Sequence, residues 1–244
     1  MISNISAVMI TKNSEKHIKE SLESLKDFEE IIIYDNGSCD NTLKIAKQFK
    51  NVKIIKGEFY GFGKTKNLAA DYAKNDWIFS IDSDEIATEQ LIKEIKNISL
   101  ENHTVYAINR KNLFLGKAVK HSGWNPDWIK RLYNKKFTKF SDVEVHESII
   151  SSKVVKLKGR LIHYAVDNTQ DTLIKMARYS TMKRKKNYII NPYFALLRAS
   201  FAFFRTYFVQ LGFLDGYAGL IISINRFIGV FHKGCYWYYN KDKL

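Results

Sequence analysis

The 244-residue chain has only two cysteines and two prolines, and both scarcities narrow the classes of protein that it can be. Cys39 and Cys235 lie far apart and lack the spacing of a metal-binding motif. A disulfide between them stays open, but the pattern favours a reduced cytoplasmic protein. With so little proline, no low-complexity stretch and no internal repeat, the chain leaves little room for disorder.

Long hydrophobic runs are also missing. The longest uncharged runs near the C-terminus, residues 206–214 and 216–225, are shorter than the ~18–20 apolar residues of a spanning helix. The apolar run 5–10 is too short for a signal peptide, and its nearest basic residues follow it. We therefore expect a protein that stays in the cytoplasm where it is made.

The chain is long enough for one catalytic domain with an extension. Its net charge is +14, and residues 170–244 hold twelve Lys or Arg against three acids, so this part carries +9. Such a basic block predicts an anionic partner, which is nucleic acid, anionic lipid or a phosphorylated substrate. A merely solvated basic face is the alternative.

Apolar runs alternate with helical patterns over the first hundred residues. The runs 5–10, 31–34, 52–55 and 77–81 read as buried strands, which predicts an α/β fold with a mostly parallel central sheet covered by helices. Ligands bind beyond the carboxyl ends of such strands. The polar residues that follow the strands are therefore candidates for a site, namely Thr11, Asn13, Asp35, Asn36, Asp82 and Asp84.

The pattern changes twice after this half. We expect one domain over residues 1–168, made of an α/β half (1–98) and a second half (99–168) with short strands. A basic, aromatic helical extension follows over 169–244, and Gly212 and Gly216 are expected to divide it into two helices.

Asp82 and Asp84 are separated by one residue directly after a predicted strand. Paired carboxylates suit Mg²⁺ or Mn²⁺, which prefer oxygen ligands and often share them with substrate phosphates. An Asp-x-Asp pair also arises by chance in acidic turns, but its place at a strand end favours the metal. Asp35 can accept from a base N–H or a ribose hydroxyl, whereas a turn with a helix cap explains only Gly37 and Asp40.

Four segments together resemble the family 2 glycosyltransferases of the GT-A fold. They are residues 8–13 (VMITKN), 32–42 (IIYDNGSCDNT), 77–84 (WIFSIDSD) and 61–70, which contains Lys66-Asn67. The resemblance implies that residues 1–168 form the catalytic domain, with a nucleotide-sugar half (1–98) and an acceptor half (99–168). It also implies that Thr11, Asn13 and Asp35 bind the nucleotide, that Lys66 binds the diphosphate, and that Asp82 and Asp84 face the metal. Lys12 and Asn36 depart from the family pattern and leave the base open.

The second half is similar to a narrower group, the lipopolysaccharide-core glucosyltransferases that act on an inner-core heptose. The matching residues are 123–128, 131–133, 140–147, 161–164 and 205–216. The Gln-x-x-Arg-Trp motif of processive synthases is absent. The resemblance therefore implies transfer of a single sugar, with glucose from UDP-glucose as the expected donor, onto a lipopolysaccharide-core or other lipid-linked saccharide.

An inverting reaction needs a general base at the acceptor hydroxyl and a Lewis acid at the leaving diphosphate. We assign Glu147 as the base, with Asp142 and Glu144 as rivals. His146 or His163 is expected to complete the metal shell, although a lone histidine is more often structural. Arg131 is expected to neutralise diphosphate charge, or else to form a surface ion pair.

The extension combines basic and aromatic residues. Arg198, Arg205 and Arg226 are separated by multiples of seven, and the basic run 183–186 precedes them. We expect helices that lie on an anionic membrane surface, which would make the protein peripheral on the cytoplasmic face of the inner membrane. Completion of the core or a dimer interface is the alternative.

Three other functions are compatible with parts of the sequence. A sugar-phosphate nucleotidyltransferase would need a glycine-rich loop after the first strand, where this chain has TKNSE. A non-enzymatic basic module for membrane or nucleic acid leaves the polar strand ends unexplained, so no nucleic-acid partner is expected. A glycosyltransferase acting on a polyprenyl-linked or capsule precursor stays open.

Overall fold

The computed structural model describes residues 1–142, 148–170, 172–174 and 191–240. The chain forms two compact units. The first comprises Met1–Arg110 and Asp127–His163, and the second comprises Lys111–Pro126 and Tyr164–Leu244. Two long strands, β6 (Thr104–Phe114) and β9 (Lys153–Val166), each begin in the first unit and end in the second.

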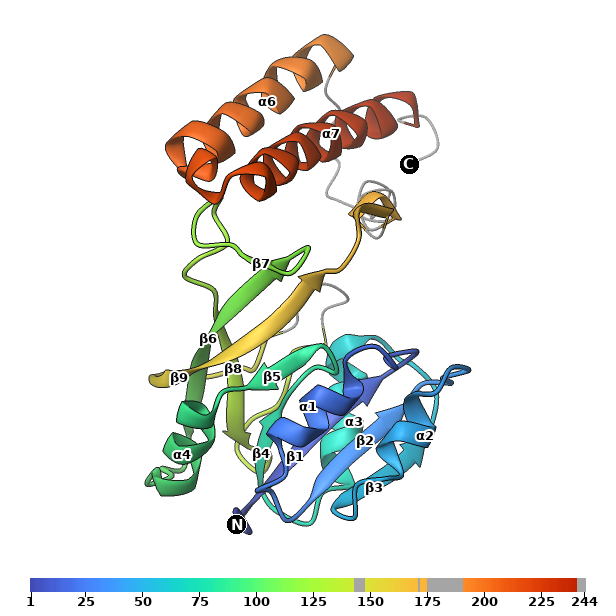
Figure 1. Cartoon of the computed structure of the whole chain (residues 1–244), viewed down its shortest axis with the longest axis vertical. Helices are drawn as coiled ribbons and strands as arrows, with labels where there is room; N and C mark the ends of the chain where they lie inside the picture. The colour runs from blue at the N-terminus through green and yellow to red at the C-terminus, as the bar shows by residue number, and fades with distance from the viewer. Residues whose placement is uncertain (143–147, 171, 175–190, 241–244) are drawn as a thin grey trace. The chain divides into compact units, whose positions relative to one another are not determined.

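Parallel strands form the N-terminal half of the first unit. They pair in the order β3-β2-β1-β4 and run side by side in Figure 1. Thr11 at the end of β1 is in register with Asp35 at the end of β2. The polar strand ends therefore meet at one edge of the sheet, as the sequence predicts. The strands are β1 (Ile5–Thr11), β2 (Ile31–Asp35), β3 (Val52–Lys56) and β4 (Trp77–Ser80).

Helices cover both faces of these strands. On one face, Ile31 and Ile33 of β2 join Leu22 of α1 and Leu91 of α4 in a buried cluster. On the other face, Ile32 contributes to a cluster with alanines of α3. β2 is buried at every position because both of its faces are covered. The helices are α1 (Ile18–Ser24), α2 (Thr42–Ala46), α3 (Phe62–Asp71) and α4 (Glu89–Asn97).

The loop after β1 leads into α1, whose N-cap residue His17 makes no side-chain capping hydrogen bond. Asn13 has a φ of 51° and holds the loop after β2, because its side chain accepts from the Cys39 N–H at 2.9 Å. Thr88, by contrast, caps α4 through its side chain as the pattern suggests.

The remaining strands are antiparallel. β8 pairs with β4 and with β6, β5 pairs with β9, and β7 pairs with β6. The sheet is therefore mixed and not mostly parallel, because parallel pairing in the described part of the chain is confined to β1, β2, β3 and β4. The additional strands are β5 (Glu85–Ala87), β7 (Lys117–Ala118) and β8 (Trp128–Asn134).

The second unit contains a helical hairpin. α6 (Pro192–Phe204) and α7 (Tyr217–Tyr239) lie side by side in Figure 1, joined by a π-helical turn (Arg205–Val209) and a 3₁₀ turn (Gly212–Asp215). The break at Gly212 and Gly216 thus occurs where it was predicted. In the part of the chain that the structure describes, no helix is long and apolar enough to cross a membrane. The basic run 183–186 lies outside the described residues.

The second unit also takes in a segment that the sequence analysis placed in the acceptor half. Asp215 is buried and accepts from the backbone N–H groups of Lys120 and His121, each at 3.0 Å, and from the Ser122 hydroxyl at 2.8 Å. Hydrogen bonding outweighs the effect of burial and lowers the pKa of Asp215 below its usual value. This carboxylate therefore ties residues 111–126 to the hairpin.

Candidate active site

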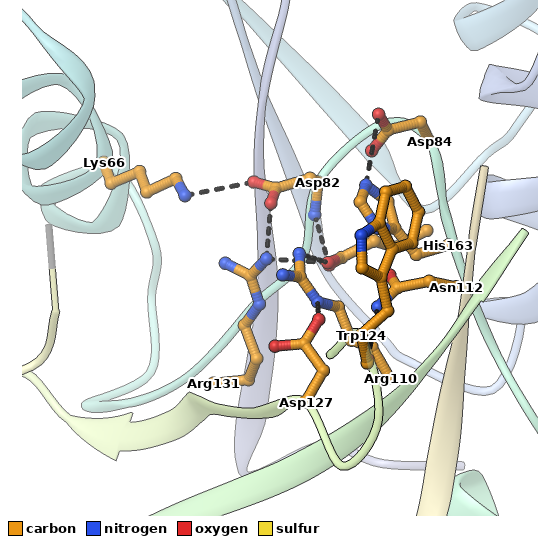
Figure 2. Close-up of polar contacts among 10 residues, drawn as sticks. Lys66, Asp82, Asp84, Arg110, Asn112, Trp124, Asp127, Arg131 and His163 are labelled. Carbon is orange, nitrogen blue, oxygen red and sulfur yellow. Dashed lines mark hydrogen bonds and ion pairs between the residues drawn. The ribbon is translucent and has the colours of Figure 1, made fainter. Parts of the chain in front are cut away.

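Asp82 follows β4, and two cationic side chains bind its carboxylate (Figure 2). The Lys66 ammonium of α3 lies 3.1 Å from Oδ1, and the Arg131 guanidinium of β8 donates to Oδ2. Lys66 and Arg131 are almost fully buried, whereas the Asp82 side chain is 29% exposed. Lys66, Asp82 and Arg131 were all predicted to contact the donor, and they come together at the Asp82 carboxylate.

Glu85 lies beneath this contact and was assigned no role from the sequence. Its side chain is fully buried, accepts from the Asp82 N–H at 3.0 Å and from Arg131 at 2.7 Å, and also pairs with Arg110 at 3.2 Å. Arg110 in turn donates to Asp127 at 2.9 Å. Three carboxylates and three cations thus form one cluster of balanced formal charge, which offsets the high cost of burying them.

The cluster shifts the pKa values of Asp82 and Arg131. Burial alone would raise the pKa of Asp82, but the charges of Arg131 and Lys66 outweigh it and hold that pKa well below its usual value. Burial would likewise lower the pKa of Arg131, whereas Asp82 and Glu85 raise it. Asp82 is therefore ionised at neutral pH, which suits an electrostatic role and not proton transfer.

Asp84 lies beyond this cluster and faces a histidine. Its Oδ2 is 3.7 Å from the His163 Nε2, and its side chain is 43% exposed (Figure 2). The contact arises because β5 begins directly after Asp84 and pairs with β9, where Glu85 is in register with His163. Two of the predicted metal ligands are thus brought together. Among the described residues, no group of three or more His, Cys, Asp or Glu could hold a metal ion.

The residues predicted to bind the nucleotide lie at the ends of β1 and β2. Asp35 is buried, and its carboxylate accepts from the Ser38 hydroxyl at 2.5 Å and from the Gly37 N–H at 3.2 Å. Asp35 therefore has a structural task that the sequence did not suggest, which is to hold the turn after its own strand. Asn13 reaches the same turn by accepting from Cys39.

A chain of hydroxyl groups links two strand ends. Thr11 donates to the Ser14 hydroxyl at 2.9 Å, and Ser14 lies 2.8 Å from the hydroxyl of Ser83. Ser83 is the middle residue of the Asp-Ser-Asp segment. Neither serine was singled out from the sequence, because a single hydroxyl carries no spacing signal. The network fixes the segment relative to the end of β1.

The segment of the candidate bases is tied to α3. Phe140 and Ile149 form a β-bridge, so that the two arms of residues 140–149 run antiparallel. The Asn67 side chain accepts from the Phe140 N–H at 2.9 Å and donates to its carbonyl at 3.0 Å. Asp142 lies on one arm and is exposed, whereas Glu144, His146 and Glu147 lie outside the described residues.

A buried cationic pair from α3 and β8 thus meets Asp82 at the end of the parallel strand β4, with Asp84 and His163 beside it, in an α/β protein. The glycosyl transferase family 2 model matches residues 6–159, which is more than half of the chain and includes Lys66, Asp82, Asp84 and Arg131. The chain belongs to this family.

Comparisons with individual proteins agree with the family. An uncharacterized glycosyltransferase of Rickettsia typhi is 28% identical over 242 residues, covering 91% of this chain and 82% of that protein. The lipopolysaccharide core biosynthesis glycosyltransferase LpsC of Rhizobium meliloti is 24% identical over 194 residues, covering 73% of this chain and 70% of LpsC.

Among solved structures, Staphylococcus aureus TarS residues 1–349 in complex with UDP align with a TM-score of 0.52 and 17% identity. The alignment covers 100% of this chain and 92% of that one. The shared fold is the mixed α/β fold of GT-A type, here with C-terminal helices, and the fold class implied by the sequence resemblance is confirmed.

Proposed function

We propose that this enzyme transfers one sugar, with inversion, from a nucleotide-diphosphate donor to a lipopolysaccharide-core or other lipid-linked saccharide. The observation that carries the proposal is the meeting of Lys66 and Arg131 at Asp82, beside Asp84 and His163. A leaving diphosphate is anionic, and buried cations next to a metal-binding carboxylate are the groups that stabilise it.

The donor would lie across the ends of β1 and β2. Thr11, Asn13 and Asp35 would face the base and ribose, and Lys66 and Arg131 would face the diphosphate while they keep their contacts with Asp82. The TarS structures contain UDP in one case and UDP-GlcNAc in another, and they share only the fold with this chain. A uridine donor is therefore the first to test, with UDP-glucose as the expected sugar.

A divalent cation fits the pair Asp84 and His163. Two protein ligands leave positions for diphosphate oxygens, as in other nucleotide-binding sites. Mg²⁺ prefers oxygen ligands alone, so the imidazole favours Mn²⁺ over Mg²⁺ at this position. When bound, the ion would supply Lewis-acid stabilisation of the leaving diphosphate. Asp82 would remain with the cationic side chains, and His146 is the alternative histidine.

The chemical step requires a base for the acceptor hydroxyl. The acceptor oxygen attacks the anomeric carbon as the bond from that carbon to the diphosphate breaks, and the hydroxyl proton passes to a carboxylate. We assign this role to Glu147, and Asp142 is the alternative among the residues that the structure describes. The similarity to LpsC supports a lipopolysaccharide-core acceptor.

A turnover screen tests this function. The purified chain would be incubated with Mn²⁺ and a panel of nucleotide sugars, with heptose-containing core saccharide, polyprenyl-linked sugar or nucleic acid as the added component. We expect nucleotide release that depends on the saccharide, and a product whose anomeric configuration is inverted by NMR. Retention of configuration, or no turnover of any nucleotide sugar, would overturn the proposal.

A further inference from the structure

An apolar stripe runs along the exposed face of α6 and continues into the turn after it. The side chains follow one another at spacings of four, four, three and four residues, which places them on one face of a helix. Their exposed fractions lie between 48% and 83%. The stripe consists of Tyr193, Leu197, Phe201, Phe204 and Phe208.

The opposite face of α6 carries small residues. Ala195 and Ala199 are buried against α7, and a Cβ atom added to Gly234 would lie 2.5 Å from the Cβ of Ala195. The two helices therefore approach closely through alanine and glycine, and α6 buries only its alanines and leaves its large side chains outside. Water-soluble hairpins bury the large residues, whereas small residues at the interface are typical of helices that pack in lipid.

The turn between the helices extends this apolar surface. Leu214 and Tyr217 are 57% and 58% exposed, and Leu211 and Phe213 are also exposed. Exposed apolar surface that extends over a helix face and the turn after it is uncommon on a monomer in water, and it marks a face that contacts a partner or a membrane. We call the stripe and these turn residues the hairpin face.

The charges around the hairpin face have one sign. Over residues 191–240 the basic residues are Arg198, Arg205, Arg226 and Lys233, and the only acid, Asp215, is buried beneath the turn. At 100° per residue, Arg198 and Arg205 fall along one edge of the stripe. An apolar face bordered by arginines matches an anionic lipid surface, in which the aliphatic stems lie among lipid and the guanidinium groups reach the phosphates.

We propose that the α6–α7 hairpin lies in the surface layer of an anionic membrane, with its stripe among the acyl chains and its arginines at the lipid phosphates. Recruitment then depends on insertion of aromatic side chains and not on charge alone. The inference stands on residues of the second unit and goes beyond the transfer reaction, so either can fail without the other.

Flotation of the full chain with vesicles tests the proposal. Vesicles of phosphatidylcholine with about 30% phosphatidylglycerol should bind the protein, and a substantial part of the binding should survive salt that screens charge. The triple variant Leu197→Ser, Phe201→Ser, Phe204→Ser should lose at least tenfold in binding and keep turnover of soluble donor. A matched triple on the first unit, Phe137→Ser, Val154→Ser, Val155→Ser, removes exposed apolar side chains and should bind normally.

A second measurement reports depth. A fluorescent probe would be attached at Phe201→Cys in a chain with Cys39→Ser and Cys235→Ser, with exposed Ser152→Cys as the control position. Nitroxides on lipid acyl chains should quench the probe at position 201 and spare the one at 152.

Three outcomes would overturn the proposal. The unmodified chain could stay unbound to anionic vesicles at low salt. Binding could vanish with salt and ignore the stripe triple, which would mean that charge alone recruits the chain. The stripe triple could instead convert a stable dimer to a monomer, which would make the hairpin face an interface between two copies.

Discussion

The side-chain amide of Asn67 pairs with both the backbone N–H and the carbonyl of Phe140. Phe140 also lies under the Lys66 ammonium, whose nitrogen is 5.3 Å from the ring centroid. One turn of α3 therefore carries the cation proposed to bind the diphosphate and the amide that holds the arm leading to the candidate bases. The proposed diphosphate-binding side chain and the arm that leads to the candidate bases are therefore joined through two adjacent residues.

Replacement of Asn67 should impair sugar transfer and leave donor binding nearly unchanged. Asn67→Ala leaves two backbone groups of Phe140 without their partner and loosens the base-bearing segment, and misplacement by about 1 Å can cost roughly a hundredfold in rate. We expect kcat for sugar transfer to fall ten- to hundredfold while the donor KM changes little. Asn97→Ala, which removes an exposed amide from α4, is the control. A raised donor KM at unchanged kcat would mean that Asn67 binds donor instead.

We expect Asp84 to be the carboxylate that is essential for metal-dependent activity, because Asp82 is already held in ion pairs. Asp84→Asn should keep the fold and lower turnover by about a hundredfold or more, roughly 3 kcal/mol of transition-state stabilisation. EDTA should abolish activity, and Mn²⁺ should restore it better than Mg²⁺. Asp76→Asn removes a comparable exposed carboxylate that pairs with Lys136, and it should be active. Full turnover by a metal-free preparation would refute the metal assignment.

Arg131 should matter for stability as well as for catalysis. Arg131→Met leaves Asp82 with Lys66 alone and the fully buried Glu85 with Arg110 alone, so the buried cluster has one negative charge in excess, and the free energy of unfolding at pH 7 should fall by about 3–5 kcal/mol. Exposed Arg160→Met on β9 is the control and should change it little.

The loss of stability caused by Arg131→Met should depend on pH. Folding lowers the pKa of Asp82, so its ion pairs stabilise the native chain above the unfolded pKa of about 3.9 and are lost as the pH falls through the folded value. The stability gap between the native chain and Arg131→Met should therefore be full at neutral pH and narrow below about pH 4. Denaturant titrations at several pH values would show it, and a gap that widens in acid would contradict the ion-pair assignment.

The identity of the base is decided by comparing two carboxylates. Glu147→Gln keeps the side-chain volume but cannot accept a proton, so donor binding should survive while transfer collapses. Asp142→Asn should retain most of the activity. Rates of product formation and donor affinities, measured for both variants, distinguish the two carboxylates. An inactive Asp142→Asn together with an active Glu147→Gln would exchange the assignments.

The parallel strands and their polar ends could be predicted because local signals agree there. β2 is apolar at every position before its last since both faces are covered, and Asp35 stands where the run stops. The antiparallel strands were harder to delimit. β9 has fourteen residues with exposed positions over much of its length, and the sequence predicts only residues 154–157, near its beginning, as a strand.

The ion cluster could not be found by spacing. Arg110 and Asp127 are seventeen residues apart and meet only because β6 and β8 are antiparallel neighbours. Glu85 directly follows Asp84 in the sequence, but nothing in the sequence distinguishes it from an acid of a surface turn. Its burial depends on Arg131 and Arg110, which the fold brings from elsewhere. Pairing of this kind is a property of tertiary structure, and a single sequence does not display it.

The Asp215 contact has a consequence for the order in which the protein is made. The ribosome releases residues 111–126 some ninety residues before Asp215, which at 5–20 residues per second is a wait of roughly 5–20 s. The first unit needs nothing after His163, so it can be finished while that loop still lacks its carboxylate. The hairpin would then mature last, and a nascent chain stalled before Asp215 would hold a complete first unit with an unfinished second unit.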